Sequence, residues 1–360
     1  MVKTLSSTLV RPRSAKTLAV RRSADLPGIR VVAIGGGTGL STLLRGLRRY
    51  VASPHQSSAD CNDAPCLISD LAAVVTVTDD GGSSGRLRRG FNMLPPGDLR
   101  NCMVALSEDE HLISRLFRYR FTAGEGLEGH SFGNLFVAAL LEITGDFAQA
   151  IKLSSQVLAT RGHIYPVTNA NVSLAARMDD GSLVSGETNI TASRQRIAEL
   201  MLEPADAAPL PETLEAIERA DLVTIGPGSL FTSIITNLLV KGVSEALASS
   251  RGVRVYICNL MTQANESLNL TASQHIERIY EHAHGPIFDY ALVNTAPVSR
   301  ALLDRYAGEG ASPIVADIEA IEALGVRCIA GDFAAEGDVV RHAADRVADA
   351  VVRLGITGRR

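Results

Sequence analysis

One short segment gathers side chains that could bind a ligand. Residues 76–90 read TVTDDGGSSGRLRRG and continue from an apolar run at residues 72–77 that predicts a buried strand. Carboxylates can hold a metal ion or accept hydrogen bonds from sugar hydroxyls, serines donate hydrogen bonds, and arginine suits phosphate. A solvated turn with a hairpin-like DDGG tip is the alternative, but so many functional groups favour a ligand site. The candidate residues are Asp79, Asp80, Ser83, Ser84 and Arg86, with Asp79 and Asp80 also the candidate catalytic residues and Mg²⁺ ligands.

A glycine-rich turn near the start of the chain is a candidate phosphate site. The apolar run at residues 31–34 is followed by glycines and then by leucines at helical spacing, which predicts a strand, a turn and a helix. A helix start offers unpaired N–H groups and partial positive charge to a phosphate. The same residues could instead form only a tight turn. The candidate binding residues are Gly36, Gly37, Thr38 and Gly39.

Two familiar nucleotide-binding motifs are absent from this turn. Gly39 is followed by Leu40, Ser41 and Thr42, so the lysine of a Walker loop is missing. The spacing of the glycines also fails the G-x-G-x-x-G pattern of dinucleotide-binding folds. An ordinary nucleotide triphosphatase and a nicotinamide-dependent dehydrogenase are therefore disfavoured.

A second strand, glycine turn and helix follows much later in the chain. Residues 221–225 predict a strand and residues 230–239 an apolar helix, with the turn Gly-Pro-Gly-Ser between them. A second anionic group, or the other end of the same ligand, could bind at this helix start. The next predicted strand, residues 253–258, ends in a polar loop. Candidate residues in these two loops are Gly226, Gly228, Ser229, Thr262 and Gln263.

Two further helix starts carry polar side chains that could face the same pocket. In LPPGDLRN, which begins at Leu94, Asp98 is placed to cap the helix that follows, and Arg100 lies in its first turn. Asn134 lies near the start of another apolar helix. We include all three among the candidate ligand-binding residues.

Length, composition and pattern together predict the fold. The chain has 360 residues, of which 46% are hydrophobic, and a formal net charge of −4, which gives no overall attraction to nucleic acid or to an anionic membrane. Alternating strand and helix patterns predict an α/β fold: a Rossmann-like, open, mostly parallel sheet with helices on both faces. Residues 171–190 alternate around Asp179-Asp180-Gly181 and predict a small β-hairpin excursion, interpreted as structural. Further strands are predicted at 290–293, 313–316 and 326–330, and a final helix at 340–354.

The remaining sequence features concern the ends of the chain and its environment. Residues 1–28 are basic and poor in acids, which predicts a disordered leader before a single α/β domain at residues 29–355, and residues 53–69 predict a surface insertion. The five cysteines are scattered, which favours free thiols and a cytoplasmic location. No apolar run reaches the length of a membrane span.

Six motifs together resemble one known family. They are IGGGTGLS at 34–41, TVTDDGGSSGRLR at 76–88, LPPGDLRNCMVAL at 94–106, GNL at 133–135, IGPGSLFTSI at 225–234 and NLMTQ at 259–263. Across about residues 30–355 the chain resembles the bacterial YvcK-type gluconeogenesis factors, in a superfamily with the CofD-like 2-phospho-L-lactate transferases of deazaflavin cofactor synthesis. The resemblance implies a Rossmann-like domain that binds a UDP-sugar and serves carbon partitioning and cell morphogenesis on gluconeogenic carbon sources.

Two functional classes follow from this resemblance. The first, which we prefer, is a UDP-sugar-binding regulatory protein without a required cofactor, acting through a protein partner and able to form a homo-oligomer. The second is a transferase that moves a phospholactyl group from a nucleotide-activated donor to a deazaflavin, with Mg²⁺ at Asp79 or Asp80 neutralising the leaving phosphate. With 4% aromatic residues, the chain has few side chains to stack on a flat acceptor.

Overall fold

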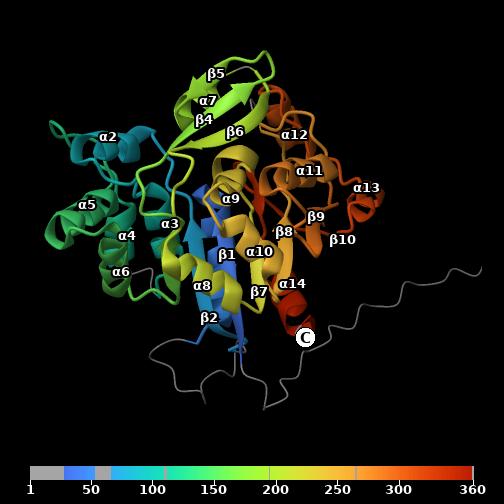
Figure 1. Cartoon of the computed structure of the whole chain (residues 1–360), viewed down its shortest axis with the longest axis horizontal. Helices are drawn as coiled ribbons and strands as arrows, with labels where there is room; N and C mark the ends of the chain where they lie inside the picture. Colours follow the sequence, from blue (N-terminus) through green and yellow to red (C-terminus); the bar gives the residue numbers. More distant parts are fainter. Residues whose placement is uncertain (1–27, 53–65, 109–111, 194, 264–265, 359–360) are drawn as a thin grey trace, which may run out of the picture.

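A sheet of seven strands runs through the centre of the molecule, and all its neighbouring strands are parallel (Figure 1). The central strands are almost continuous runs of buried apolar side chains, as expected where helices cover both faces. The predicted Rossmann-like α/β fold is thereby confirmed. In spatial order the strands are β10 (Arg327–Gly331), β9 (Tyr290–Asn294), β8 (Val253–Ile257), β7 (Leu222–Ile225), β1 (Ile29–Gly35), β2 (Ile68–Val75) and β3 (His163–Pro166).

The order of these strands contains a topological switch between β1 and β7. From β1 the chain moves outward through β2 and β3, then returns to β7 on the other side of β1 and moves outward again through β8, β9 and β10. Because parallel crossovers are right-handed, the helices that follow β1 and β7 lie on opposite faces of the sheet. A crevice therefore opens between the two helix starts, at the carboxyl ends of the strands, where open α/β sheets bind ligands.

Helices cover both faces of the sheet. On one face α1 (Gly37–Leu47) packs between α3 (Gly97–Leu106) and α14 (Ala344–Thr357). On the other, α8 (Pro211–Arg219) packs against α10 (Val243–Ser249) and against β1. Further helices are η1 (Arg48–Tyr50), α2 (Gly82–Phe91), α4 (Leu112–Arg118), α5 (Phe132–Thr144), α6 (Phe147–Val157), η2 (Leu230–Ile235), α9 (Thr236–Leu238), α11 (Ala272–Ala283), α12 (Arg300–Ala307) and α13 (Ile318–Ala323).

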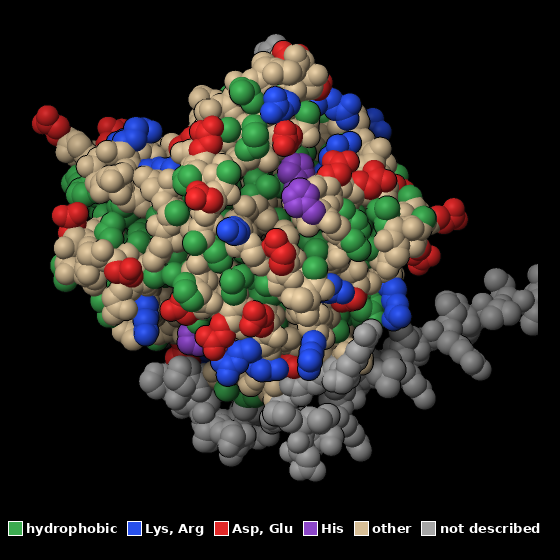
Figure 2. Space-filling model, viewed as in Figure 1, with side chains coloured by type: hydrophobic (Ala, Val, Ile, Leu, Met, Phe, Trp, Pro, Cys, Tyr) green, Lys and Arg blue, Asp and Glu red, His purple; other side chains and the backbone are tan. Residues whose placement is uncertain are grey.

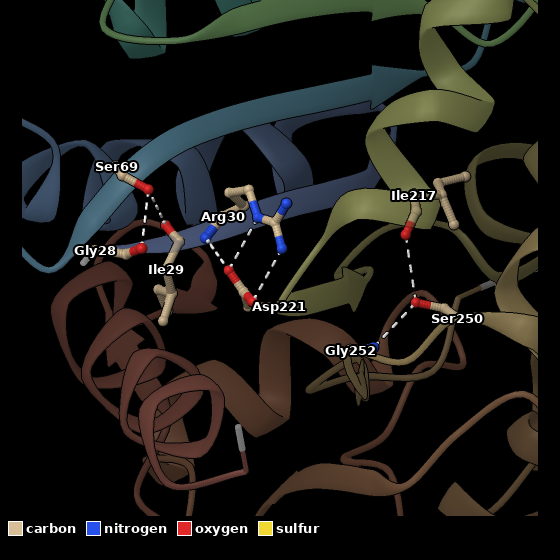
Figure 3. A network of polar contacts seen from close by, with 8 residues as sticks. All are labelled: Gly28, Ile29, Arg30, Ser69, Ile217, Asp221, Ser250 and Gly252. Atoms are coloured by element: carbon tan, nitrogen blue, oxygen red, sulfur yellow. Dashed lines mark hydrogen bonds and ion pairs between the residues drawn. The ribbon is translucent and has the colours of Figure 1, made fainter. Parts of the chain in front are cut away.

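Arginine–aspartate pairs fix the register of the sheet at its amino edge. The backbone N–H and the guanidinium of Arg30, on β1, both donate to Asp221, just before β7, over 2.8 to 3.3 Å (Figure 3). Arg254, on β8, contacts Asp289, just before β9, in the same way over 2.9 to 3.0 Å. Planar guanidinium groups suit such two-pronged contacts. With the strand starts held, the loops at the carboxyl edge are held in register as well.

Two small antiparallel sheets stand outside the main one. The first comprises β5 (Leu183–Ser185), β4 (Ser173–Met178) and β6 (Ile197–Glu203), with α7 (Glu187–Ala192) between β5 and β6, and it lies beyond the carboxyl edge of the parallel sheet (Figure 1). The predicted hairpin is thus confirmed, and β6 extends it. The second comprises β11 (Ala334–Glu336) and β12 (Val340–His342).

Two predicted elements were wrong. Residues 313–316 form no strand, since Pro313 makes only an isolated bridge with Met261 and proline has no N–H for a ladder. The last helix begins at Ala344, and residues 340–342 form strand β12 instead. Over so few residues, the period of the apolar side chains and the secondary-structure propensities do not distinguish a short strand from the first turn of a helix.

The structure describes residues 28–52, 66–108, 112–193, 195–263 and 266–358. The predicted leader, apart from Gly28, and most of the predicted insertion therefore lie outside the described residues. Cys102, Cys258 and Cys328 are free thiols, whereas Cys66 is disulfide-bonded, so the expectation of a free thiol at that position was wrong.

The surface carries charges of both signs, and its apolar helices are short or bent. On the face shown in Figure 2, acidic and basic side chains are interspersed over its coloured part. Within the described ranges no single helix has the length and apolar composition of a membrane span. The segments Leu230–Leu238 and Val243–Ser249 meet that criterion only when joined, and they are bent by 77° relative to each other.

Candidate functional site: a cavity between two glycine turns

A cavity of about 740 Å³ opens at the topological switch. Its walls include the turn after β1, the turn after β7 and the loop after β8, so Thr38 and Ser229 face one space although they lie far apart in the sequence. The predicted binding residues that line it are Gly36, Gly37, Thr38, Gly39, Asp79, Asp98, Gly228, Ser229, Thr262 and Gln263.

The two glycine turns touch each other directly. A Cβ atom on Gly39 would lie 2.3 Å from the carbonyl oxygen of Pro227, and one on Gly36 would lie 2.6 Å from the methyl group of Thr76. Both positions therefore need glycine for packing, independently of any ligand. At Gly37 the reason is conformational, because its φ is +62°. The glycines thus bring the two helix starts together, which is a second role beside the predicted phosphate contact.

A carboxylate of the protein already occupies part of the first helix start. The N–H of Gly37 donates to Oδ2 of Asp98 over 2.7 Å. The prediction that Asp98 caps its own helix was wrong, since Pro96 is the N-cap of α3 and Asp98 contacts the start of α1 instead. Next to it, the N–H groups of Thr38 and Gly39 have no hydrogen-bond partner among the described residues. These two donors are the ones available to an anion.

At the second helix start, after β7, more of the polar groups have hydrogen-bond partners within the protein than at the first. The side chain of Asn259 accepts from the N–H of Gly228 over 3.2 Å and donates to its carbonyl oxygen over 2.7 Å. The buried carboxylate of Glu266 accepts from the N–H of Phe231 and from the hydroxyl of Thr232, the latter over 2.8 Å. The amide nitrogen of Gln263 donates to the hydroxyl of Ser229 over 3.0 Å, while its Oε1 is buried and has no partner within the described chain.

Three carboxyl groups line the cavity: Asp79, Asp98 and Glu187. Burial, reinforced by the charge of Asp79, raises the pKa of Asp98 to about 6, although the Gly37 N–H and Arg100 oppose the shift. Burial, together with the charges of Asp79 and Asp98, raises the pKa of Glu187 to about 8. Glu187 is therefore protonated at neutral pH. These carboxyl groups can hydrogen-bond to the hydroxyl groups of a ligand.

Strand β12 adds a basic and a neutral group to the lining of the cavity. Arg341 is exposed at the cavity and makes no ion pair with a described acid. His342 contacts the carbonyl oxygen of Cys258 through Nε2 over 3.0 Å, and burial lowers its pKa to about 4. A neutral imidazole in this contact carries its proton on Nε2, so Nδ1 is left as a hydrogen-bond acceptor.

Several predicted site residues do not line the cavity. Asp80 accepts hydrogen bonds from the N–H and the hydroxyl of Thr188 instead. The Ser83 hydroxyl is buried between Nδ1 of His130, at 2.9 Å, and the amide of Asn134, at 3.1 Å. The residues outside the lining are Asp80, Ser83, Ser84, Arg86, Arg100, Asn134 and Gly226.

The structure gives each of the others a local role. Ser84 is buried, with its hydroxyl close to Gly97. Arg86 donates to the carbonyl oxygen of Glu128, and Arg100 donates to the side chain of Asn101. Gly226 has a φ of +83°, and a Cβ there would lie 2.9 Å from the carbonyl oxygen of Ile257.

The predicted Mg²⁺ pair consists of two carboxylates with different neighbours. Oδ1 of Asp79 accepts from the N–H of Gly81 over 2.9 Å, whereas Oδ1 of Asp80 accepts from Thr188. Among the described residues, no group of three or more His, Cys, Asp or Glu side chains is arranged to hold a metal ion. Mg²⁺ at Asp79 or Asp80 stays a prediction.

Sequence reasoning missed several residues of the cavity. Glu187 comes from the excursion that was interpreted as structural, and Arg341 and His342 lie where a helix was expected. No local pattern marks them, because only the tertiary fold brings them to the carboxyl edge. Asn259 did carry a signal in the sequence, since it is a polar residue directly after a predicted buried strand. The missed lining residues that the argument uses are Glu187, Asn259, Tyr306, Arg341 and His342.

Comparison with known proteins agrees with this architecture. The family model of "2-phospho-L-lactate transferase CofD" matches residues 31–334. A protein of Halalkalibacterium halodurans named gluconeogenesis factor is 46% identical over 323 residues, which cover 89% of this chain and 95% of that protein. The gluconeogenesis factor of Bacillus subtilis is 43% identical over 326 residues, covering 90% and 98%.

A solved structure shares the fold. The crystal structure of a UPF0052 family protein from Bacillus halodurans superposes with a TM-score of 0.84 at 45% identity, covering 91% of this chain and all of that one. With a family match over most of its length and relatives this similar, the chain belongs to the CofD family.

Proposed function

We propose that this protein binds a nucleotide sugar, specifically a UDP-sugar, and acts as a regulator rather than as an enzyme. One observation carries the proposal: the two glycine turns meet at the topological switch of a parallel sheet and enclose one polar cavity. The relatives named gluconeogenesis factor support a role connected with gluconeogenesis. The proposal extends that role to carbon partitioning and cell morphogenesis on gluconeogenic carbon sources. The output would be a cytoplasmic interaction with a protein partner that depends on the ligand.

The charges of the cavity suggest how the ligand lies. The diphosphate would contact the free N–H groups of Thr38 and Gly39 and the guanidinium of Arg341. The hydroxyls of the sugar would lie against Asp79.

A transferase is the second candidate, since the family model carries the name of a phospholactate transferase. In that case Asp79 or Asp80 would hold Mg²⁺, and the metal ion would neutralise the charge that develops on the leaving phosphate. A flat deazaflavin acceptor would be expected to stack on aromatic rings. Among the described lining residues, Tyr306 is the one Phe, Tyr or Trp side chain. The cavity is thus better suited to a sugar than to a large aromatic acceptor.

Calorimetry tests the proposal directly. Purified protein is titrated with UDP-N-acetylglucosamine, UDP-glucose, GDP and NAD, and binding of a uridine nucleotide sugar without turnover is the expected result. Arg341→Ala should weaken that binding about tenfold, the order expected for one charge-assisted hydrogen bond. The matched control is Arg251→Ala, an exposed arginine just before β8 at the amino edge of the sheet. Turnover of a GDP-linked phospholactyl donor with a deazaflavin acceptor would reverse the ranking of the two functions.

A further inference from the structure

The start of α7 makes two contacts with the loop that follows β2. Oε2 of Glu187 accepts from the hydroxyl of Thr78 over 3.3 Å. The adjacent Thr188 donates its N–H to Oδ1 of Asp80 over 2.9 Å and donates its hydroxyl to the same oxygen. The small antiparallel sheet is therefore tied to the carboxyl edge of the parallel sheet through two neighbouring residues of α7.

The carboxyl groups of Asp80 and Glu187 differ in whether an oxygen remains available to a ligand. The two hydrogen bonds that Asp80 accepts from described residues both come from Thr188, and Asp80 does not line the cavity. Glu187 does line it, beside Asp79 and Asp98, and its Oε1 accepts no hydrogen bond from a described residue. The carboxyl group of Glu187 thus has one oxygen held by the protein and one available to a ligand.

We propose that Glu187 contacts the hydroxyl-bearing part of the bound nucleotide sugar and that Asp80 positions Glu187 through Thr188. The inference rests on the proposed function and deepens it, because it makes the small sheet part of the binding site. Asp80 is then a positioning residue, which explains how a carboxylate in the DDGG motif serves the site without lining it.

The surroundings of Glu187 determine its protonation. Asp79 and Asp80 face it from the loop after β2, Asp98 from α3 and Glu266 from the loop before α11, while Arg88 on α2 is the nearby cation. The acids outnumber the cation, and with burial they hold the pKa of Glu187 at about 8. At pH 7 the group is a hydrogen-bond donor as well as an acceptor.

A bound diphosphate adds negative charge to the same cavity and therefore favours the protonated form of Glu187 further. Binding above pH 8 must then be accompanied by proton uptake, and the affinity must fall as the pH rises through the pKa of the free protein. A glutamine at this position mimics the protonated acid and has no proton to lose. The pH dependence of binding thus separates a ligand contact from a purely structural role.

The experiment is calorimetry with UDP-N-acetylglucosamine at pH 7.0 and 8.5 on wild type, Glu187→Gln and Glu187→Ala. Wild-type affinity should fall several-fold between the two pH values, and Glu187→Gln should keep the pH 7 affinity with a flatter profile. Glu187→Ala should bind about fivefold more weakly at pH 7, as expected for one lost hydrogen bond. Because the uracil ring also loses a proton in alkali, variants are compared with one another at equal pH.

Glu319→Gln is the matched control, since Glu319 is also a first-turn glutamate of a six-residue helix, exposed on α13. It should bind like wild type at both pH values. Asp80→Asn should weaken binding while the pH slope remains. It should also speed hydrogen exchange of the α7 amides in the ligand-free protein without changing exchange in β1 or β7.

The outcomes distinguish this inference from the proposed function. If wild type binds no nucleotide sugar, both are overturned. If wild type binds but both Glu187 variants match it in affinity and in pH slope, the inference alone is overturned and the function stands. If Asp80→Asn leaves both binding and α7 exchange unchanged, Asp80 does not position Glu187.

Discussion

The two glycine turns resemble each other in sequence but satisfy their helix starts differently. After β1, the carboxylate that caps the helix is Asp98, which lines the cavity and leaves the next two N–H groups free. After β7, the capping carboxylate is Glu266, which lies outside this cavity, and Asn259 holds the turn itself. The first turn is therefore built to respond to a ligand, and the second is built to support the first.

The largest effect is expected where the two turns touch. In Gly39→Ala the new Cβ would meet backbone atoms of Pro227, at 2.3 Å from the oxygen, which a side-chain shift cannot relieve. We expect a loss of about 3 kcal/mol in the free energy of unfolding, as for overpacked cores, together with loss of nucleotide-sugar binding. Urea unfolding and calorimetry measure the two effects.

Gly90→Ala is the control for this variant, because Gly90 also lies in a helix and a Cβ there would meet nothing within 4 Å. It should be neutral or stabilise the protein by up to about 1 kcal/mol, since alanine favours helix. Equal stability of the two variants would show that the contact between the turns does not matter.

The two capping carboxylates provide the next comparison. Glu266→Ala leaves the buried N–H of Phe231 without a partner and removes the acceptor of the Thr232 hydroxyl, which together should cost about 2 kcal/mol in urea unfolding. Asp98→Ala should cost roughly half as much, because the freed N–H of Gly37 faces the cavity and can bind water. The reverse order would contradict the assignment of the second turn as the supporting one.

The sequence predicted the parts of this site that depend on local pattern. Apolar runs followed by glycines marked both turns, and parallel strand order then placed them at one edge. It did not predict that Asp98 caps a distant helix, that Asp80 holds α7, or that Glu187 reaches the cavity. Each of these contacts joins segments from separate parts of the chain. Spacing within one segment carries no information about such a partner.

The smallest expected effect concerns the charge of Asp98 itself. The pKa of this carboxyl is about 6, so it is ionised at pH 7.5 and opposes an anionic ligand. Asp98→Asn removes that charge but keeps an oxygen that can accept from the Gly37 N–H. We expect about threefold tighter binding of UDP-N-acetylglucosamine at pH 7.5, which is the size of a partly screened charge effect.

The direction in which ligand affinity changes with pH also distinguishes Asp98 from Glu266. An anionic ligand favours the protonated form of Asp98, so wild-type affinity should fall as the pH rises from 5 to 7, through the pKa of about 6. Asp98→Asn should lose this part of the profile. Glu266→Gln should keep it, since Glu266 lies outside the cavity even though its own pKa is raised by burial. If the two variants gave the same profile in calorimetry, the difference between a ligand-facing and a supporting carboxylate would not hold.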